Sequence, residues 1–298
     1  MPEKVDKAFR LLQMHERLSK GESIVKDTAL DEFSVPSKTF QRDVGSLRLY
    51  YAEQGKGDLV YDRKGNCYRL TAQAGKLTKQ EIFAVCKVLI ESRAFNKAEF
   101  DLIIGKLLQQ CDVAESKAVK ALIANEQVDY IPLQHGKLLV DVLWELSNCI
   151  TTQNVIRFSY KRIDGTVREH DVKPVGIMFS EFYFYLIAFM ADDRKKSPTV
   201  FRVDRISDLA RLDKRFSVPY ATRFSEAEFR KRVQFMYPGD LRRLRFRYKG
   251  NLEAVLDRLP TAEVESQTDD GAIIRAEAYG DGIDMWLRGQ GEKVEVLK

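Results

Sequence analysis

The chain has 298 residues, of which 44% are hydrophobic and 31% are charged, and its formal net charge is +5. This composition excludes an intrinsically disordered chain, and the length favours two or three domains over one. No apolar run approaches the roughly 20 residues of a membrane-spanning helix, and the first residues lack the apolar core of a signal peptide, so we expect a cytoplasmic protein without a membrane partner.

The cysteines and histidines lack the spacing of metal or redox sites. There is no Cys-x-x-Cys pair, and no two histidines stand one helical turn apart. Free cysteine is often a small core residue. We therefore expect reduced cysteines and no metal or other cofactor, for the residues Cys67, Cys86, Cys111, Cys149, His15, His135 and His170.

Residues 1–75 show the pattern of a small DNA-binding domain. Apolar residues recur at helical spacing over residues 5–19, and a second short helix is expected over residues 23–33. A third helix should begin after a tight turn with Ser37 as its N-cap. Residues 59–70 read as a β-hairpin with a basic tip. Three helices and a hairpin resemble a winged helix-turn-helix.

The third helix carries polar side chains near its start, on or beside the outer face. The first residues of a helix in the major groove reach base edges, and Arg and Gln match the edges of guanine and adenine. The residues expected to contact DNA are Lys38, Thr39, Gln41 and Arg42 on the helix, and Arg63 and Lys64 at the hairpin tip. The alternative is an ordinary amphipathic helix with a solvated charged face.

The charge of this domain is small. Residues 1–75 contain 13 basic and 11 acidic residues, a net charge of +2. One copy would therefore bind DNA weakly, which favours a homodimer on a double-stranded operator.

Residues 76–138 are expected to form a helical linker. Thr78 and Glu81 have the spacing of a capping box at the start of a helix, and helical character continues, with breaks, to residue 124. The linker could supply dimer contacts, or its helices could simply pack on the domain that follows.

Three strands are predicted in the next segment, after a helix over residues 139–148. The central one, residues 182–188, is an apolar and aromatic run in which successive side chains alternate between two faces. One face can build a core and the other presents tyrosines. Residues 155–161 and 200–206 interleave apolar residues with polar or charged ones, and Asp164-Gly165 is a good hairpin turn.

The order and spacing of four segments resemble a WYL domain: residues 156–160, 174–177, 184–188 and 201–206. The namesake tryptophan of the family is Phe184 here, which keeps an aromatic ring but loses the indole N–H. Residues 37–47 are also similar to the recognition-helix segment found ahead of WYL domains. The resemblance implies a small SH3-like or Sm-like β-barrel within residues 139–215 that senses ligands derived from nucleic acids.

The predicted barrel strands carry polar and cationic side chains between aromatic ones. Arginine forks hold phosphates bidentately and tyrosine rings stack on bases, so these strands predict a pocket for a nucleotide or a single-stranded nucleic acid. The candidate residues are Arg157, Ser159, Tyr160, Lys161, His170, Tyr183, Tyr185, Arg202 and Arg205.

Arg202 and Arg205 raise a geometric question. In an unbroken strand they face opposite ways, so both could reach one ligand only if a bulge or a strand end occurs at Asp204. The alternative is that Arg205 pairs with Asp204 or Asp208 and staples the turn.

Residues 216–298 are expected to form a ferredoxin-like domain with the order β-α-β-β-α-β. This segment resembles the C-terminal extension that often follows WYL domains, and it could mediate dimerisation. Residues 201–250 hold 14 basic and 6 acidic residues, a surplus of +8, whereas residues 251–298 hold 5 and 11, a deficit of −6. The basic segment could attract an anion, or it could pair with the acidic tail.

The sequence therefore predicts a multidomain α+β protein with four parts: a winged helix-turn-helix (1–75), a helical linker (76–138), a WYL-like barrel (139–215) and a ferredoxin-like domain (216–298). The predicted function is a ligand-responsive transcription regulator, with repression and activation both open. The alternative is a structural or adaptor protein that binds nucleic acid without switching. We expect no enzyme, because the sequence shows no nucleophile with a base, phosphate loop or metal cluster.

Overall fold

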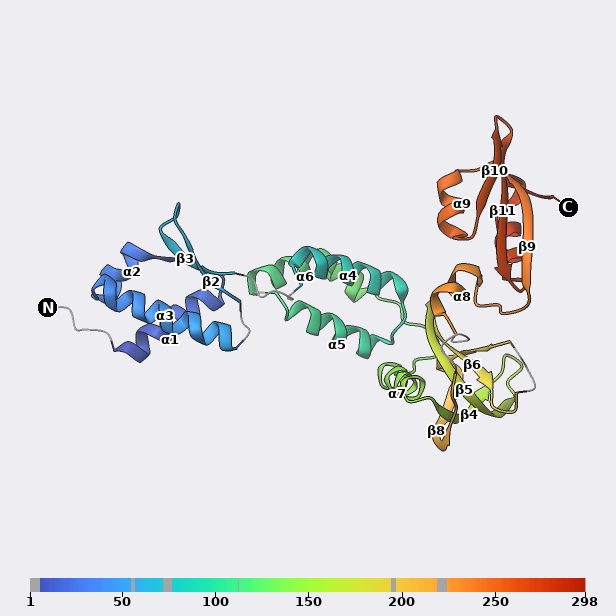
Figure 1. Ribbon diagram of the computed structural model, residues 1–298, viewed down its shortest axis with the longest axis horizontal. Coiled ribbons are helices and arrows are strands. Elements are labelled where there is room, and N and C mark those ends of the chain that lie inside the picture. The colour runs from blue at the N-terminus through green and yellow to red at the C-terminus, as the bar shows by residue number, and fades with distance from the viewer. Residues whose placement is uncertain are drawn as a thin grey trace. The chain divides into compact units, whose positions relative to one another are not determined.

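The computed structural model describes residues 6–54, 57–71, 77–111, 113–193, 197–218 and 224–297. In these residues it is a mixed α+β structure with three antiparallel sheets, in agreement with the predicted fold class (Figure 1). It divides into two compact units. One consists of Met1–Glu91 and Phe100–Tyr130, and the other of Ser92–Glu99 and Ile131–Lys298.

The first unit begins with three helices and a small sheet. Its elements are α1 (Lys7–Ser19), β1 (Ile24–Val25), α2 (Lys26–Phe33), α3 (Ser37–Glu53), β2 (Leu59–Asp62) and β3 (Cys67–Leu70). The sheet has the order β1-β3-β2, and the β2–β3 hairpin is the wing that the sequence predicts. These are the elements, in order, of a winged helix-turn-helix.

Two local predictions for this segment are wrong. The second helix begins at Lys26 and not at residue 23, because Ile24 and Val25 pair with β3 as a short strand. Ser37 is the first residue of α3 and not its N-cap. The N-cap position belongs to Pro36, whose extended backbone, with φ −63° and ψ 149°, leads into the helix without a side-chain cap.

An ion pair lies inside this domain, between α1 and α3. Arg10 Nε and Nη2 lie 2.9 and 2.8 Å from Asp43 Oδ2, and the two side chains are 5% and 2% exposed. Around them the three helices pack an apolar core that includes Met14, Leu18, Phe33, Phe40, Val44, Leu47 and Tyr51. The pair therefore fixes α3 to α1 and turns the acidic side chain of α3 inward.

We predict that Asp43→Ala destabilises the first unit by about 3–5 kcal/mol, because it removes the carboxylate that the buried Arg10 binds through Nε and Nη2. Denaturant unfolding followed by circular dichroism measures this loss. The matched control is Arg42→Ala, an exposed neighbour on the same helix, which should change the unfolding free energy by less than about 0.5 kcal/mol. Equal losses in the two variants would contradict a structural role for the pair.

Three further helices complete the first unit: α4 (Lys79–Ser92), α5 (Lys97–Leu108) and α6 (Val113–Val128). The predicted capping box is present, since the Thr78 N–H donates to Glu81 Oε2 at 2.7 Å and the Glu81 N–H donates to Thr78 Oγ1 at 3.3 Å. Lys87 pairs with Glu126 between α4 and α6. The helices therefore pack on one another, around the buried side chains Ile82, Cys86, Ile104, Val119 and Ile123.

The second unit contains a five-stranded sheet preceded by α7 (Val140–Thr151). Its elements are β4 (Asn154–Lys161), β5 (Val167–Ser180), β6 (Tyr183–Met190), β7 (Thr199–Arg202), the 3₁₀ turn η1 (Val203–Arg205) and β8 (Ile206–Arg215). The strand order is β7-β6-β5-β4-β8. Because η1 joins the two end strands directly, the connection has the form of an SH3-like barrel.

Strand β6 is buried on both faces. Leu186 and Ala188 face the barrel core, as the alternation predicts. On the other face Ile187 is fully buried, because it packs against Phe229 of α8 (Glu226–Arg232). The sequence predicted that Tyr183, Tyr185 and Ile187 share this face, but not that a helix about 40 residues later in the chain covers part of it.

The rest of the chain has the predicted β-α-β-β-α-β order. Its elements are β9 (Leu241–Tyr248), α9 (Leu252–Arg258), β10 (Glu263–Thr268), β11 (Gly271–Tyr279), α10 (Gly282–Gly289), η3 (Gly291–Lys293) and β12 (Val294–Leu297). The strand order β10-β11-β9-β12 is that of a ferredoxin-like sheet. Leu244, Phe246 and Tyr248 face the core shared with the two helices.

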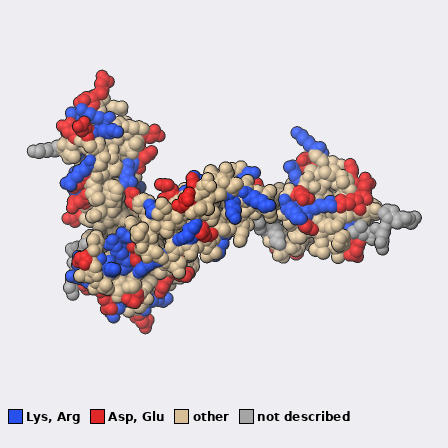
Figure 2. All heavy atoms as spheres, turned by 180° about the vertical axis from the view of Figure 1, so that it is seen from behind, with Lys and Arg blue, Asp and Glu red and all other residues tan. Residues whose placement is uncertain are grey.

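The opposite face of this sheet is a ladder of ion pairs. Arg243 pairs with Glu277, Arg245 with Glu265, and Arg247 with Glu295. Much of the basic stretch predicted from the sequence is therefore neutralised by the acidic tail, which is the second of the two alternatives. Figure 2 shows Lys and Arg interspersed with Asp and Glu over the C-terminal part of the chain.

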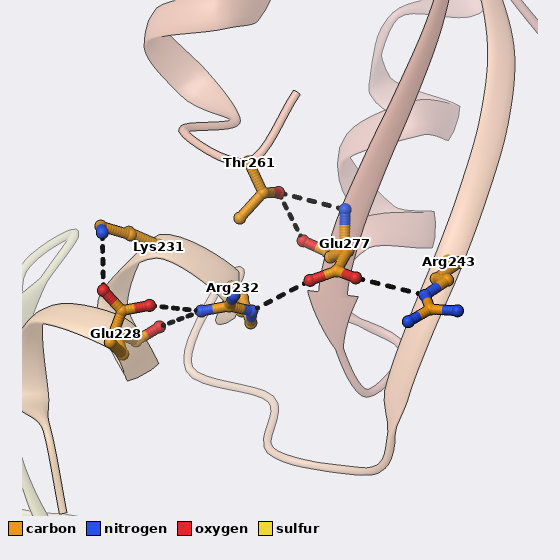
Figure 3. A network of polar contacts seen from close by, with 6 residues as sticks. All are labelled: Glu228, Lys231, Arg232, Arg243, Thr261 and Glu277. Atoms are coloured by element: carbon orange, nitrogen blue, oxygen red, sulfur yellow. Dashed lines mark hydrogen bonds and ion pairs between the residues drawn. The ribbon is translucent and has the colours of Figure 1, made fainter. Parts of the chain in front are cut away.

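Helix α8 touches both the barrel and the ferredoxin-like sheet. Glu226 Oε1 accepts the backbone N–H of Ile177 at 2.9 Å, just after a bulge in β5, and a Cβ on Gly176 would lie 2.5 Å from that oxygen. At its other end Arg232 lies between Glu228 and Glu277 (Figure 3). The helix thus holds the two sheets through one polar contact to each.

Candidate nucleic-acid interface and ligand site

The outer face of α3 is cationic. Lys38, Gln41 and Arg42 are exposed there, and Thr39 is half-buried. No hydrogen bond or ion pair joins the side chains of the three exposed residues to any other residue that the structure describes. In the sequence from residue 37 to residue 52 the one acidic residue is Asp43, which is buried. This face can therefore take an anionic partner without first breaking an internal contact.

The wing presents two more cations. Arg63 and Lys64 are exposed in the turn between β2 and β3. The turn is ordered by Asp62, whose Oδ1 accepts the Lys64 N–H at 3.0 Å and whose Oδ2 pairs with Arg69 at 3.0 Å. Arg48 Nε donates to the Leu59 carbonyl at 3.2 Å and ties α3 to β2. The six predicted DNA contacts thus lie on two connected elements of one small domain.

Arg202, in the barrel, is held by an aromatic ring and a carboxylate. Its guanidinium carbon lies 3.4 Å from the centre of the Tyr183 ring. Its Nε and Nη2 donate to Asp204 Oδ1 and Oδ2 at 3.0 and 2.8 Å, and Asp204 is buried. The carboxylate occupies one edge of the guanidinium, so the edge formed by Nη1 and the second Nη2 hydrogen is left for another acceptor.

The electrostatics of this group keep Arg202 charged. Burial disfavours the charged form, but the hydrogen bonds and the charge of Asp204 outweigh it and hold the pKa of Arg202 above its ordinary value. Burial also raises the pKa of Tyr185, which lies opposite Arg202 in the β6–β7 pair. The group therefore combines a fixed guanidinium with neutral phenols, which is suited to a phosphate.

Arg202 and Arg205 do not lie in one unbroken strand, because a strand end separates them. Strand β7 stops at Arg202, and η1 turns the chain before β8 begins. The Arg205 side chain is half-buried and forms no hydrogen bond or ion pair within the described residues. Asp204 pairs with Arg202 instead. The predicted staple between Arg205 and Asp204 or Asp208 is therefore wrong, because the bidentate partner of Asp204 is Arg202.

The other predicted ligand residues do not all join Arg202. Tyr160 touches it through one contact, since the phenol oxygen accepts the Arg202 backbone N–H at 3.2 Å. The Tyr160 ring packs with those of His170 and Phe201, and burial lowers the pKa of His170.

Strand β4 presents a different face. Arg157 binds Asp171 through Nε and Nη2 at 2.6 and 2.8 Å, and the pKa of Arg157 rises with that pairing. Ser159 and Lys161 alternate with Tyr160 along the strand, on the face of Arg157. The structure therefore gives one group at Arg202, Tyr183 and Tyr185, and not one pocket of nine residues.

Two features of the barrel were not predicted. His135 lies near Asp204 and Arg202, and burial lowers its pKa. Its Nδ1 accepts the Lys137 N–H at 3.0 Å, while its buried Nε2 has no partner among the described residues. A groove of about 460 Å³ is lined by Lys173, Val175, Phe189, Asp193, Lys214, Arg215, Phe216 and others. No local sequence signal marks either feature, because each is assembled from separate segments.

We predict that replacing Arg202 lowers the stability of the second unit and that replacing Arg205 does not. Arg205→Ala should change the unfolding free energy of the second unit by less than about 0.5 kcal/mol. Arg202→Ala should lower it by about 3 kcal/mol, because the buried Asp204 loses its counter-charge. Thermal unfolding of the two variants measures the difference. A larger loss from Arg205→Ala would restore the staple that the sequence suggested.

The fold and these sites define a class: a multidomain α+β protein with a cationic helix-turn-helix and an SH3-like barrel. Residues 141–211 match the family model of the WYL domain, so this segment of the chain has the pattern of that domain. The matched range begins in α7 and ends in β8, and it contains the Arg202 group.

Two solved structures are similar to the chain. The proteasome accessory factor PafBC of Arthrobacter aurescens is 16% identical with a TM-score of 0.31, over 98% of this chain and 44% of that one. A CRISPR Cas-related protein is 12% identical with a TM-score of 0.38, over 89% of this chain and 69% of that one. The chain thus spans less than half of PafBC. Both TM-scores are too low to support an argument about function.

No curated protein matches the chain. Among the helices that the structure describes, none has the length and apolar character needed to cross a bilayer. The described residues also contain no group of three or more His, Cys, Asp or Glu side chains that could hold a metal ion.

Proposed function

We propose that this protein is a DNA-binding transcription regulator whose WYL domain senses a nucleotide or a single-stranded nucleic acid. The observation that carries the proposal is the outer face of α3. Lys38, Gln41 and Arg42 are exposed and unpaired within the described residues, and no acidic residue is exposed beside them up to residue 52. A recognition helix needs such a face, because it must meet both phosphates and base edges.

The proposed sensor is the group around Arg202. Asp204 and Tyr183 already fix the guanidinium, so binding a phosphate at its free edge costs little ordering of the side chain. Tyr185 is close enough to take part in binding. The proposed signal is a change in how the protein holds DNA, and linkage requires the effect to be reciprocal.

A homodimer is part of the proposal. One domain with so small a net charge offers few phosphate contacts, and two copies would double them on an inverted repeat. The proposed action is binding and switching, without catalysis. A protein that binds DNA equally well with and without nucleotide would instead be an adaptor.

We predict that Arg42→Ala lowers specific DNA binding by about 1–3 kcal/mol, and that Gln41→Ala does the same, if these side chains read base edges. Lys64→Ala on the wing is the matched control. It should weaken binding to all sequences alike and reduce the salt dependence. Fluorescence anisotropy with a selected duplex and a random duplex gives the ratio. An unchanged ratio in Arg42→Ala would exclude α3 as the reading helix.

We predict that Arg202→Lys weakens nucleotide binding by roughly one to two orders of magnitude, because lysine keeps the charge beside Asp204 but loses the fork. Calorimetry with mononucleotides and short single-stranded oligonucleotides measures the affinity. Arg157→Lys is the matched control, since Arg157 sits on β4 paired with Asp171. Equal affinities in the wild type and both variants would rule out this ligand site.

A further inference from the structure

Gly45 lies on the outer face of α3, at the middle of the helix. Residues three, four and seven positions apart share one helix face, so Lys38, Arg42, Gly45 and Leu49 form one stripe. All four are exposed, and the buried residues of α3 lie on the opposite side. The stripe therefore consists of two cations, a glycine and an exposed leucine.

Nothing inside the protein requires a glycine at this position. A Cβ built on Gly45 would meet no atom within 4 Å. Its φ angle is not positive, so the backbone is one that any residue adopts. Glycine is among the least favourable residues in a helix interior. The folded chain would thus be more stable with alanine here, and packing inside the described fold does not explain the glycine.

The shape of the helix around Gly45 is a shallow notch. Ser46, the next residue, turns its hydroxyl back to the helix and donates to the Arg42 carbonyl at 3.0 Å. Longer side chains stand on either side, since Arg42 precedes the notch and Leu49, 62% exposed, follows it. A surface that meets this stripe can approach the backbone more closely at Gly45 than at either neighbour.

We infer that α3 approaches duplex DNA most closely at Gly45, and that the missing side chain lets the helix lie deep enough for Lys38 and Arg42 to reach base edges. The partner is assigned by charge, because the charged members of the stripe from Lys38 to Leu49 are both cations; the exposed carboxylate of Glu53 follows only at the last residue of the helix. Gly45 is thus a positioning residue. This inference rests on the proposed function, since it takes α3 to be the reading helix.

The chain offers a matched control. Gly105 lies within α5, and a Cβ built on it would also meet nothing within 4 Å. Because Gly105 is half-buried and Gly45 is exposed, the two alanine substitutions are the matched pair, and they should have similar effects on helix stability. Only those at Gly45 should alter binding to DNA.

The experiment uses the full chain with Gly45→Ala, Gly45→Leu, Gly105→Ala and Gly105→Leu. The probe is a fluorescein-labelled duplex that the wild type selects from a random-sequence pool. Both alanine variants should raise the thermal midpoint, by about 3 °C. The dissociation constant should rise about tenfold in Gly45→Ala and about a hundredfold in Gly45→Leu, and both Gly105 variants should match the wild type.

Three results would overturn the inference. The first is a Gly45→Leu variant that binds within about twofold of the wild type, while Arg42→Ala loses selectivity. In that case the proposed function stands and the close approach does not. The second is an equal loss in Gly45→Ala and Gly45→Leu, because a steric cause must grow with side-chain size. The third is a wild type that selects no duplex, which removes the proposed function as well. If Gly45→Leu fails to fold, Gly45→Ala decides.

Discussion

The outer face of α3 depends on a buried ion pair behind it. A carboxylate inside a helix-turn-helix needs a counter-charge, because desolvation of an isolated charge is expensive. Arg10 supplies that charge to Asp43 and joins α1 to α3. The same pairing removes the one acidic side chain of residues 37–52 from the surface. This contact thus keeps the first three turns of the outward face free of an acidic side chain, and it adds to the core contacts that orient the helix.

A second carboxylate acts in the same way at the barrel. Asp204 is buried and holds one edge of the Arg202 guanidinium, while Tyr183 supports its face. The pair has no net charge, so an anion would be recognised there by the direction of the free N–H groups more than by a long-range field. The ferredoxin-like sheet differs from the barrel in its ion pairs. On its outer face, basic and acidic side chains of neighbouring strands pair with one another, as Arg245 does with Glu265.

Helix α8 makes the barrel and the ferredoxin-like sheet parts of one packed body. Phe229 and Met236 are buried with Met178 and Ile187 of the barrel, and Tyr279 of β11 packs against the same cluster. The polar contacts of Glu226 and Arg232 add direction to this packing.

The sequence by itself determined the class, most elements and the WYL resemblance, because periodicity, capping and turn residues are local properties of the chain. The Thr78–Glu81 box, the β2–β3 hairpin and the final β-α-β-β-α-β order were all predictable in this way. Tertiary structure alone decided what depends on distant segments. Strand β1 forms because β3 lies beside it and pairs with it. Asp204 pairs with Arg202 because β7 ends at Arg202 and the chain turns in η1. The sequence left open whether the basic surplus of residues 201–250 attracts an anion or pairs with the acidic tail. The fold decided for pairing over much of β9, because it places β11 and β12 beside that strand.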